Sequence, residues 1–227
     1  AAAYSVVAYQ TAYLKANFPA EFMSANLTNE INDTEKMSEY ISEARQMGIE
    51  ILPPDINLSE KEFTVSEGKI VYGLIGIKNV GTAAVDEIVR ERDENGLYSS
   101  FEDFLDRSDL RVINKKVLEA LIKSGLFDKI ANGRAILYNN LDRLVEAALR
   151  EQESRKYGQS SLFESADVND FPAIELEAVP EWPEKELLAF EKENLGFYFS
   201  GHPLKKYKNI YEKCVTLRLN ELDRSTG

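Results

Sequence analysis

Cysteine, histidine and long apolar runs are scarce in this sequence of 227 residues. It has one cysteine, Cys214, and one histidine, His202, so the chain cannot form an internal disulfide and we expect no zinc site of the usual ligand types. No apolar run approaches the ~20 residues that a membrane-spanning helix needs, and no signal peptide is apparent. These absences predict a globular protein of the reducing cytoplasm, with no metal ligands of its own and no membrane partner.

Basic residues are also fewer than acidic ones: the chain has 27 Lys and Arg and 39 Asp and Glu, so its net charge is −12. Such an acidic balance argues against simple coating of nucleic acid. The charge is uneven, however: eight basic and four acidic residues lie from Arg107 to Arg143, and ten acidic residues and two lysines lie from Glu164 to Glu193. We interpret the first stretch as facing DNA and the second as a linker. A solvated helical face beside an acidic linker is the alternative.

Apolar periodicity predicts a mainly α protein with a small β-hairpin. The β-hairpin is expected where residues 63–65 and 69–74 alternate around Ser66-Glu67-Gly68. Asn32 and Glu35 form a capping signal for a helix that Gly48 ends. Helices are expected over 1–18, 20–27, 32–48, two or three over 107–150 with the last at 134–150, and 184–194.

Residues 74–88, LIGIKNVGTAAVDEI, have the pattern of a helix-hairpin-helix. Leu74 and Ile77 share one face of a short helix, residues 78–81 break it, and Thr82 begins a second helix. Asn79 and Gly81 are residues that tolerate positive φ, which a tight hairpin needs. A corner between helices packed in a core is the alternative interpretation.

The first turn of that second helix is a candidate phosphate site. Backbone N–H groups at a helix amino end are free, and the helix dipole makes that end partly positive. Such ends bind phosphate without reading bases. We expect one DNA phosphate to contact the amides of Val80, Gly81 and Thr82 and the Thr82 hydroxyl, with Lys78 adding charge and Asn79 shaping the turn.

A second candidate hairpin follows at residues 118–127, LEALIKSGLF. Lys123, Ser124 and Gly125 are the residues expected to contact a second phosphate, and a helix resumes at Arg134. Two anchors would fix a duplex that a single anchor would let swivel. A simple glycine helix stop explains the same residues equally well.

The sequence contains five informative segments: AAAYSVVAYQTAYLKANFPAEFMSANL (1–27), ILPPDIN (51–57), GLIGIKNVG (73–81), LIKSGLFD (121–128) and LGFYFSGHPL (195–204). Together they resemble the alpha subunits of bacterial DNA polymerase III, the replicative polymerase. The resemblance implies a DNA-directed DNA polymerase whose palm carboxylates, and the Mg²⁺ they hold, lie upstream. Because the chain opens at Ala1 in a helical pattern without methionine, we expect an inactive fragment with no cofactor.

The resemblance also implies a domain order. We expect the helical end of the fingers, a β-hairpin connector, a tandem helix-hairpin-helix domain, a linker with a clamp-binding motif, a helical connector and the start of a truncated nucleic-acid-binding, OB-like barrel. The corresponding ranges are 1–50, 51–72, 73–157, 158–180, 181–213 and 214–227.

Within the linker, residues 159–163 have the form Q-x-x-L-F, which resembles the peptide by which bacterial polymerases bind the sliding clamp. Leu162 and Phe163 would enter an apolar pocket, and Gln159 would hydrogen-bond at its rim. A local apolar anchor on the domain surface is the alternative.

The function expected is therefore non-catalytic binding of the duplex DNA backbone and the sliding clamp, beside other replicase subunits. Two alternatives stay open. One is a protein-interaction scaffold in which the hairpins are packing corners, and the acidic balance favours it. The other is a glycosylase-like enzyme, which would need a catalytic aspartate beyond the hairpin, whereas Asp86 falls within the second helix.

Overall fold

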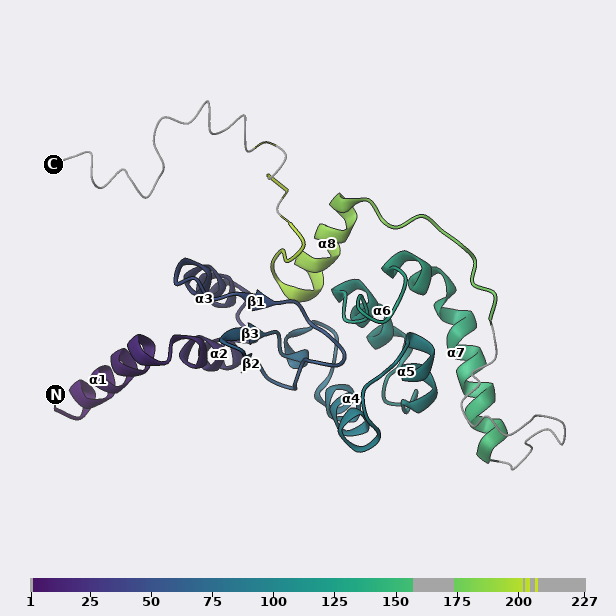
Figure 1. Ribbon diagram of the computed structural model, residues 1–227, viewed down its shortest axis with the longest axis horizontal. Helices are drawn as coiled ribbons and strands as arrows, with labels where there is room; N and C mark the ends of the chain where they lie inside the picture. Colours follow the sequence, from purple (N-terminus) through teal and green to yellow (C-terminus); the bar gives the residue numbers. More distant parts are fainter. Residues whose placement is uncertain (1, 157–173, 202, 205–206, 208–227) are drawn as a thin grey trace.

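The computed structural model describes residues 2–156, 174–201, 203–204 and 207. It is an elongated, mainly helical molecule, with α1 (Ala2–Asn17) near one end and α7 (Arg134–Lys156) near the other (Figure 1). A three-stranded sheet lies between α2 and α3 on one side and the remaining helices on the other. The predicted fold class, mainly α with a small β element, is confirmed.

The first three helices follow the local signals closely. Pro19 occupies the first turn of α2 (Pro19–Asn29), where its missing N–H costs nothing. The cap of α3 (Thr34–Gln46) differs from expectation: the Asp33 carboxylate, not Asn32, accepts hydrogen bonds from the amides of Glu35 and Lys36. Asp33 caps better here because it lies directly before the helix.

The sheet has the order β1-β3-β2, from strands Ile51–Leu52, Lys69–Val71 and Thr64–Ser66. β2 and β3 form the predicted antiparallel hairpin. Its two turn residues, Glu67 and Gly68, have φ of 52° and 75°, as the tight turns that match strand twist require. β1 pairs parallel to β3, and so ties the segment after α3 to the base of the first helix-hairpin-helix.

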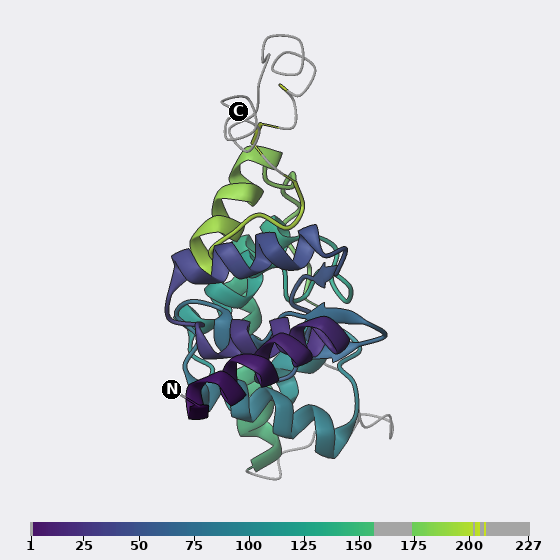
Figure 2. The same cartoon turned by 90° about the vertical axis from the view of Figure 1, so that its left-hand side faces the viewer.

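The remaining helices are η1 (Leu74–Gly76), α4 (Thr82–Asn95), α5 (Phe101–Arg107), α6 (Lys115–Ser124) and α8 (Glu184–Leu195). α5, which has only seven residues and is capped by the Ser100 hydroxyl, was not predicted. α7 continues six residues past the expected end at Arg150 to Lys156. In the view of Figure 2, α1 lies in front and α8 lies above α3. No helix of the described residues combines the length and apolar character needed to cross a bilayer.

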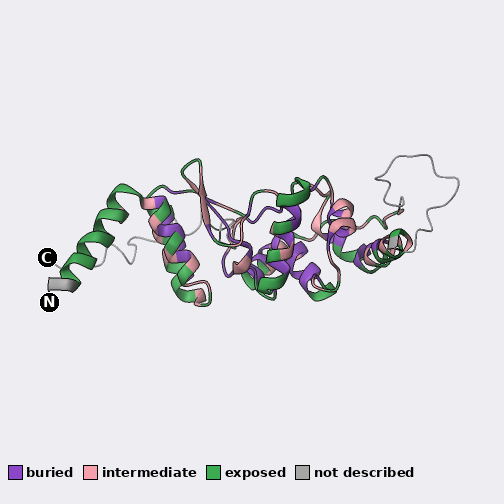
Figure 3. Ribbon diagram, turned by 90° about the horizontal axis from the view of Figure 1, so that it is seen from below, coloured by how far each residue is buried: buried purple, intermediate pink, exposed green. Residues whose placement is uncertain are grey.

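One hydrophobic core runs from α2 to α7, with an aromatic centre formed by Tyr98, Phe101, Phe104 and Phe127. Buried residues gather in the middle of the molecule, whereas α1 is exposed along its length (Figure 3). Tyr4 and Tyr9 of α1 are 84% and 70% exposed. The core therefore supports the region of the two hairpins and leaves α1 outside.

Candidate nucleic-acid interface

The first hairpin is held rigidly by buried apolar side chains on both sides of its turn. Leu74, Ile77 and Val80 lie in the core before the turn, and Ala84 and Val85 lie in it after the turn. The first helix is shorter than predicted: η1 is a single 3₁₀ turn, and Ile77 is already extended, with φ −78° and ψ 117°. The buried apolar side chains, more than the length of the first helix, therefore fix the geometry of the first hairpin.

The turn uses one of the two expected left-handed residues. Asn79 has φ of 67°, as predicted. The prediction for Gly81 was wrong, because Gly81 has φ −77° and ψ 157° and serves as the N-cap of α4. An extended N-cap is accessible to every residue type. Gly81 therefore contributes an unobstructed approach, and an added Cβ would meet no atom within 4 Å.

The amino end of α4 is open. Gly81, Thr82 and Ala83 are exposed, no side chain caps the helix, and its first turn has no acidic residue. Within the described residues the amides of Gly81 and Thr82 have no hydrogen-bond acceptor, whereas the Val80 amide donates to the Ile77 carbonyl at 3.2 Å. The amides of Gly81 and Thr82 and the Thr82 hydroxyl can donate hydrogen bonds to an anion, while Val80 is an anchor.

Two lysines lie near this end. Lys78 is exposed, and its side chain has no ion pair within the described part of the chain. Lys61 lies beside η1, because its carbonyl accepts from the Ile75 amide, and its ammonium pairs with Asp86 of α4 at 2.6 Å. Lys61 was not predicted, since no local pattern links it to the hairpin. This ion pair neutralises Asp86, the first acidic residue of α4.

The carboxyl end of α8 supports the first hairpin from the far end of the sequence. The Lys78 amide donates to the Asn194 carbonyl at 2.9 Å. The buried Tyr72 hydroxyl lies 2.8 Å from the Gly76 carbonyl and 3.2 Å from the Leu195 carbonyl. Burial raises the pKa of Tyr72 well above its ordinary value, so the phenol remains a donor.

The predicted residues of the second hairpin lie in a different environment. Ser124 is 1% exposed and donates to the Leu121 carbonyl, and Gly125, with φ of 82°, ends α6. Both lie at the carboxyl end of the helix, where the dipole disfavours an anion. The Lys123 ammonium packs over the rings of Tyr138 and Phe190, 4.8 and 5.2 Å from their centroids.

The amino end of α7, which follows this hairpin, is already capped by a carboxylate. Glu181 accepts hydrogen bonds from the amides of Arg134 and Ala135, at 2.7 and 3.1 Å. The same carboxylate would crowd a Cβ added to Gly133. Glu181 was not singled out from the sequence because it lies in the connector, 47 residues from Arg134. The two hairpins therefore differ: α4 presents free amides, and α7 has an internal anion.

Most cations of the basic stretch form ion pairs with carboxylates of the same chain. Lys116 and Arg143 are exposed and have no ion pair within the described residues. Burial lowers the pKa of the Arg134 guanidinium and the carboxylates of Asp128 and Glu191 raise it, so that the net change is a rise. The pairs are Arg107 with Glu91, Arg111 with Asp109, Lys115 with Asp142, Lys129 with Asp55, and Arg134 with Asp128.

Several predicted features lie outside the described residues. These are the clamp-binding residues Gln159, Leu162 and Phe163 and the start of the OB-like barrel expected at 214–227. Of the described residues, no group of three or more His, Cys, Asp or Glu is placed to hold a metal ion.

Comparison with known proteins bears on the same region. The family model described as "Helix-hairpin-helix motif" matches residues 48–137. The DNA polymerase III subunit alpha of Borreliella burgdorferi is 52% identical over 96% of this chain. Those of Treponema pallidum and Vibrio cholerae are 45% and 39% identical over 99% and 97% of it. The chain spans 19% of the length of each of these relatives. Over the segment that it spans, the chain belongs to the DNA polymerase III alpha subunit family and carries a helix-hairpin-helix motif.

Proposed function

We propose that this chain is the duplex-holding, non-catalytic part of a bacterial replicative DNA polymerase. The observation that carries the proposal is the open amino end of α4, set on a turn whose apolar anchors are buried. A preformed set of amides costs little entropy when it binds a phosphate. DNA-directed DNA polymerase activity, with its Mg²⁺, belongs in this proposal to the longer protein.

The contact is made by few groups. One phosphate oxygen accepts from the amides of Gly81 and Thr82, and the Thr82 hydroxyl donates to a second. Lys78 adds a positive charge, and Asn79 holds the left-handed turn that points these donors outward. None of them would reach a base edge, so binding would be independent of sequence and sensitive to salt.

In this proposal the second hairpin has a supporting role. Ser124 and Gly125 close α6, and Lys123 packs the hairpin against α8 through the Phe190 ring. Glu181 fills the position at α7 that corresponds to the open amides of α4. A duplex phosphate would reach α7 only after this carboxylate moved.

Fluorescence anisotropy with a labelled duplex at low and moderate salt tests the first hairpin. We expect Lys78→Gln with Thr82→Ala to weaken binding roughly tenfold, the effect of losing one charged and one neutral contact. Lys36→Gln is the control, because Lys36 is an exposed lysine of α3 that pairs with Glu30. Equal affinity of the wild type and the double variant would show that the hairpin is a structural corner.

We also propose that residues 159–163 bind the sliding clamp. Burying Leu162 and Phe163 is worth about 3–6 kcal/mol before ordering costs, so we expect an affinity near micromolar. Leu162→Ala with Phe163→Ala should abolish binding to immobilised clamp, and Gln159→Ala should weaken it less. Duplex binding should not change. Clamp binding by the double variant at wild-type strength would place the contact elsewhere, and loss of helical content would make both residues core residues.

A protein-interaction scaffold, contacting other replicase subunits, is the second candidate. The net charge of −12 and the internal pairing of most cations in the basic stretch favour it. The duplex assay separates the two candidates, since a scaffold would bind no duplex even at low salt. Nothing in the geometry favours a glycosylase, because Asp86 lies on the exposed face of α4 in an ion pair with Lys61.

A further inference from the structure

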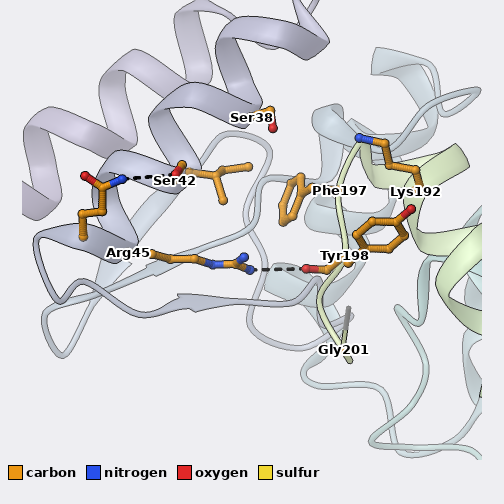
Figure 4. Close-up of a pocket in the computed structure, with 9 residues that line it drawn as sticks. Ser38, Ser42, Arg45, Lys192, Phe197, Tyr198 and Gly201 are labelled. Carbon is orange, nitrogen blue, oxygen red and sulfur yellow. Dashed lines mark hydrogen bonds between the residues drawn. The ribbon is translucent and has the colours of Figure 1, made fainter. Parts of the chain in front are cut away.

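A cavity of about 510 Å³ lies between α3 and the chain that follows α8 (Figure 4). Its two walls are more than a hundred residues apart in sequence, as the hydrogen bond from Arg45 to the Tyr198 carbonyl illustrates. None of the residues that form it belongs to either hairpin. They are Ser38, Ile41, Ser42, Arg45, Gln46, Lys192, Phe197, Tyr198 and Gly201.

Two cations line this cavity, Arg45 from α3 and Lys192 from α8. The Arg45 guanidinium donates to the Tyr198 carbonyl at 3.3 Å, and the Lys192 ammonium donates to the Gly196 carbonyl at 2.7 Å. Within the described residues neither side chain has a carboxylate partner, unlike most cations of the basic stretch. Each keeps donors available, so the cavity favours an anion.

Polar groups continue along the α3 wall. Ser38, Ser42 and Gln46 succeed one another at intervals of four residues, which places them on one face of the helix. The Gln46 amide lies 3.5 Å from the Ser42 hydroxyl. Hydroxyl and amide side chains of this kind, together with Arg and Lys, make most contacts to the sugar-phosphate backbone of DNA.

The opposite wall offers an aromatic ring on a fixed loop. The half-exposed Tyr198 lies beside Lys192, whose ammonium is 5.8 Å from the ring centroid. The loop is held by Glu191, a buried carboxylate that accepts from the amides of Phe199 and Ser200 at 2.8 and 3.0 Å. An aromatic ring beside cations is the arrangement that stacks unpaired bases.

The positively charged surface around the cavity is small. A neighbouring hollow along α3 shares Ser38, Ser42 and Lys192 but adds the carboxylates of Glu35 and Glu39. A long anionic track would be repelled there. The positive part of the surface therefore accommodates one phosphate group, and the cavity volume suits one ligand of nucleotide size.

We infer that this cavity binds one unpaired nucleotide of single-stranded DNA, with its phosphate between Arg45 and Lys192 and its base against Tyr198. The inference rests on the proposed function, in which the chain holds DNA, and extends it from the duplex to an adjoining single strand. The site is separate from the open amides of α4, so the two contacts can be tested independently.

The test measures anisotropy of a labelled oligothymidine of about 12 nucleotides with the whole 227-residue chain. Arg45→Gln with Lys192→Gln should weaken binding roughly tenfold or more and make the salt dependence shallower. Lys36→Gln is the matched control, since it removes one charge from the same helix but does not line the cavity. An equal loss in the control would reduce the binding to nonspecific charge attraction and overturn the inference.

A second variant removes no charge. Ser42→Phe fills the cavity from an exposed helix position, so it should weaken oligothymidine binding while thermal unfolding is unchanged. The inference is wrong if the wild-type chain binds no oligothymidine. It is also wrong if both cavity variants bind oligothymidine as well as the wild type does. Duplex binding, measured separately, decides the proposed function.

Discussion

Gly81 ends the turn of the first hairpin and Gly125 begins the turn of the second, and glycine serves the two positions for different physical reasons. Gly125 has φ of 82°, and a Cβ there would lie 2.3 Å from the Arg134 guanidinium. Gly81 has an ordinary φ of −77° and open space where a Cβ would be. Glycine is thus needed by the backbone at Gly125, and at Gly81 its small size leaves the amides of α4 accessible.

Gly81→Asp should bind duplex DNA much more weakly and unfold at the same temperature or higher. Its carboxylate would cap α4, which stabilises a helix by only a few tenths of a kcal/mol relative to glycine at that position, and would occupy the anion position. Thermal unfolding and duplex anisotropy measure the two effects. Asn139→Asp adds the same charge at an exposed position of α7 and serves as the control. Unchanged duplex affinity in Gly81→Asp would contradict the phosphate contact.

Gly125→Ala should instead lower the free energy of unfolding by roughly 1 kcal/mol or more, since it combines a left-handed backbone with a steric clash. Chemical denaturation measures this directly. A stability equal to that of wild type would mean that the turn after α6 can relax, and that the second hairpin is not rigid.

At the scale of elements, the helices differ in what satisfies their first amides. α3, α5 and α6 are capped by Asp33, Ser100 and Asn114, each adjacent in sequence. α7 is capped by Glu181, from a segment that also exchanges two hydrogen bonds between Glu177 and Asn140. The connector before α8 is therefore part of the second hairpin, and it fixes the position of α7.

Glu181→Ala should lower the stability by about 1 kcal/mol, the typical cost of losing a cap, and the midpoint of thermal unfolding by roughly 2–4 °C. Glu175→Ala is the control, since Glu175 is an exposed acid of the same connector. A similar loss in both variants would mean that general charge, rather than capping, sets the stability of α7.

The same variant also tests the second hairpin as a DNA contact. Removing Glu181 frees the amides of Arg134 and Ala135 and takes away a negative charge that would repel phosphate. Duplex affinity should rise if DNA reaches α7. No change in affinity, together with the loss of stability, would restrict the DNA contact to α4.

At the scale of the whole molecule, the hairpins, the connector and α8 form one unit around a shared core. α8 joins both hairpins, because its end accepts from Lys78 and its Phe190 ring packs against Lys123. α1 lies outside that core and exposes its aromatic side chains. In the proposed function this unit holds DNA, and nucleotide transfer belongs to the longer protein.

The chain alone should therefore incorporate no nucleotide into a primed template. Nucleotide transfer needs divalent metals held by carboxylates that also align the primer end, and the described residues contain no such group. A primer-extension assay with Mg²⁺, using a complete polymerase as the positive control, measures this. Extension by the purified chain, free of host polymerase, would contradict the assignment of catalysis to the rest of the longer protein.

Features with a strong local signal were predicted correctly from the sequence. Asn79 has the positive φ expected in the first hairpin, Gly48 follows the end of α3 with φ of 80°, and Glu67-Gly68 forms the β-hairpin turn. Each depends on backbone preferences of one or two residues. Weaker signals misled: α5 was too short to be recognised, and Gly81 was assigned a positive φ because glycine permits several conformations and a pattern cannot choose among them.

The sequence by itself determined the helical class, the family resemblance and the position of the first hairpin, since these follow from periodicity, turn residues and matching segments. Only the tertiary structure decided which charges and amides remain available. Arg134 meets Glu191, α7 meets Glu181, and Arg45 meets the loop after α8 across 57, 47 and 153 residues. Contacts over such separations depend on how the elements pack, and no local pattern of residues encodes them.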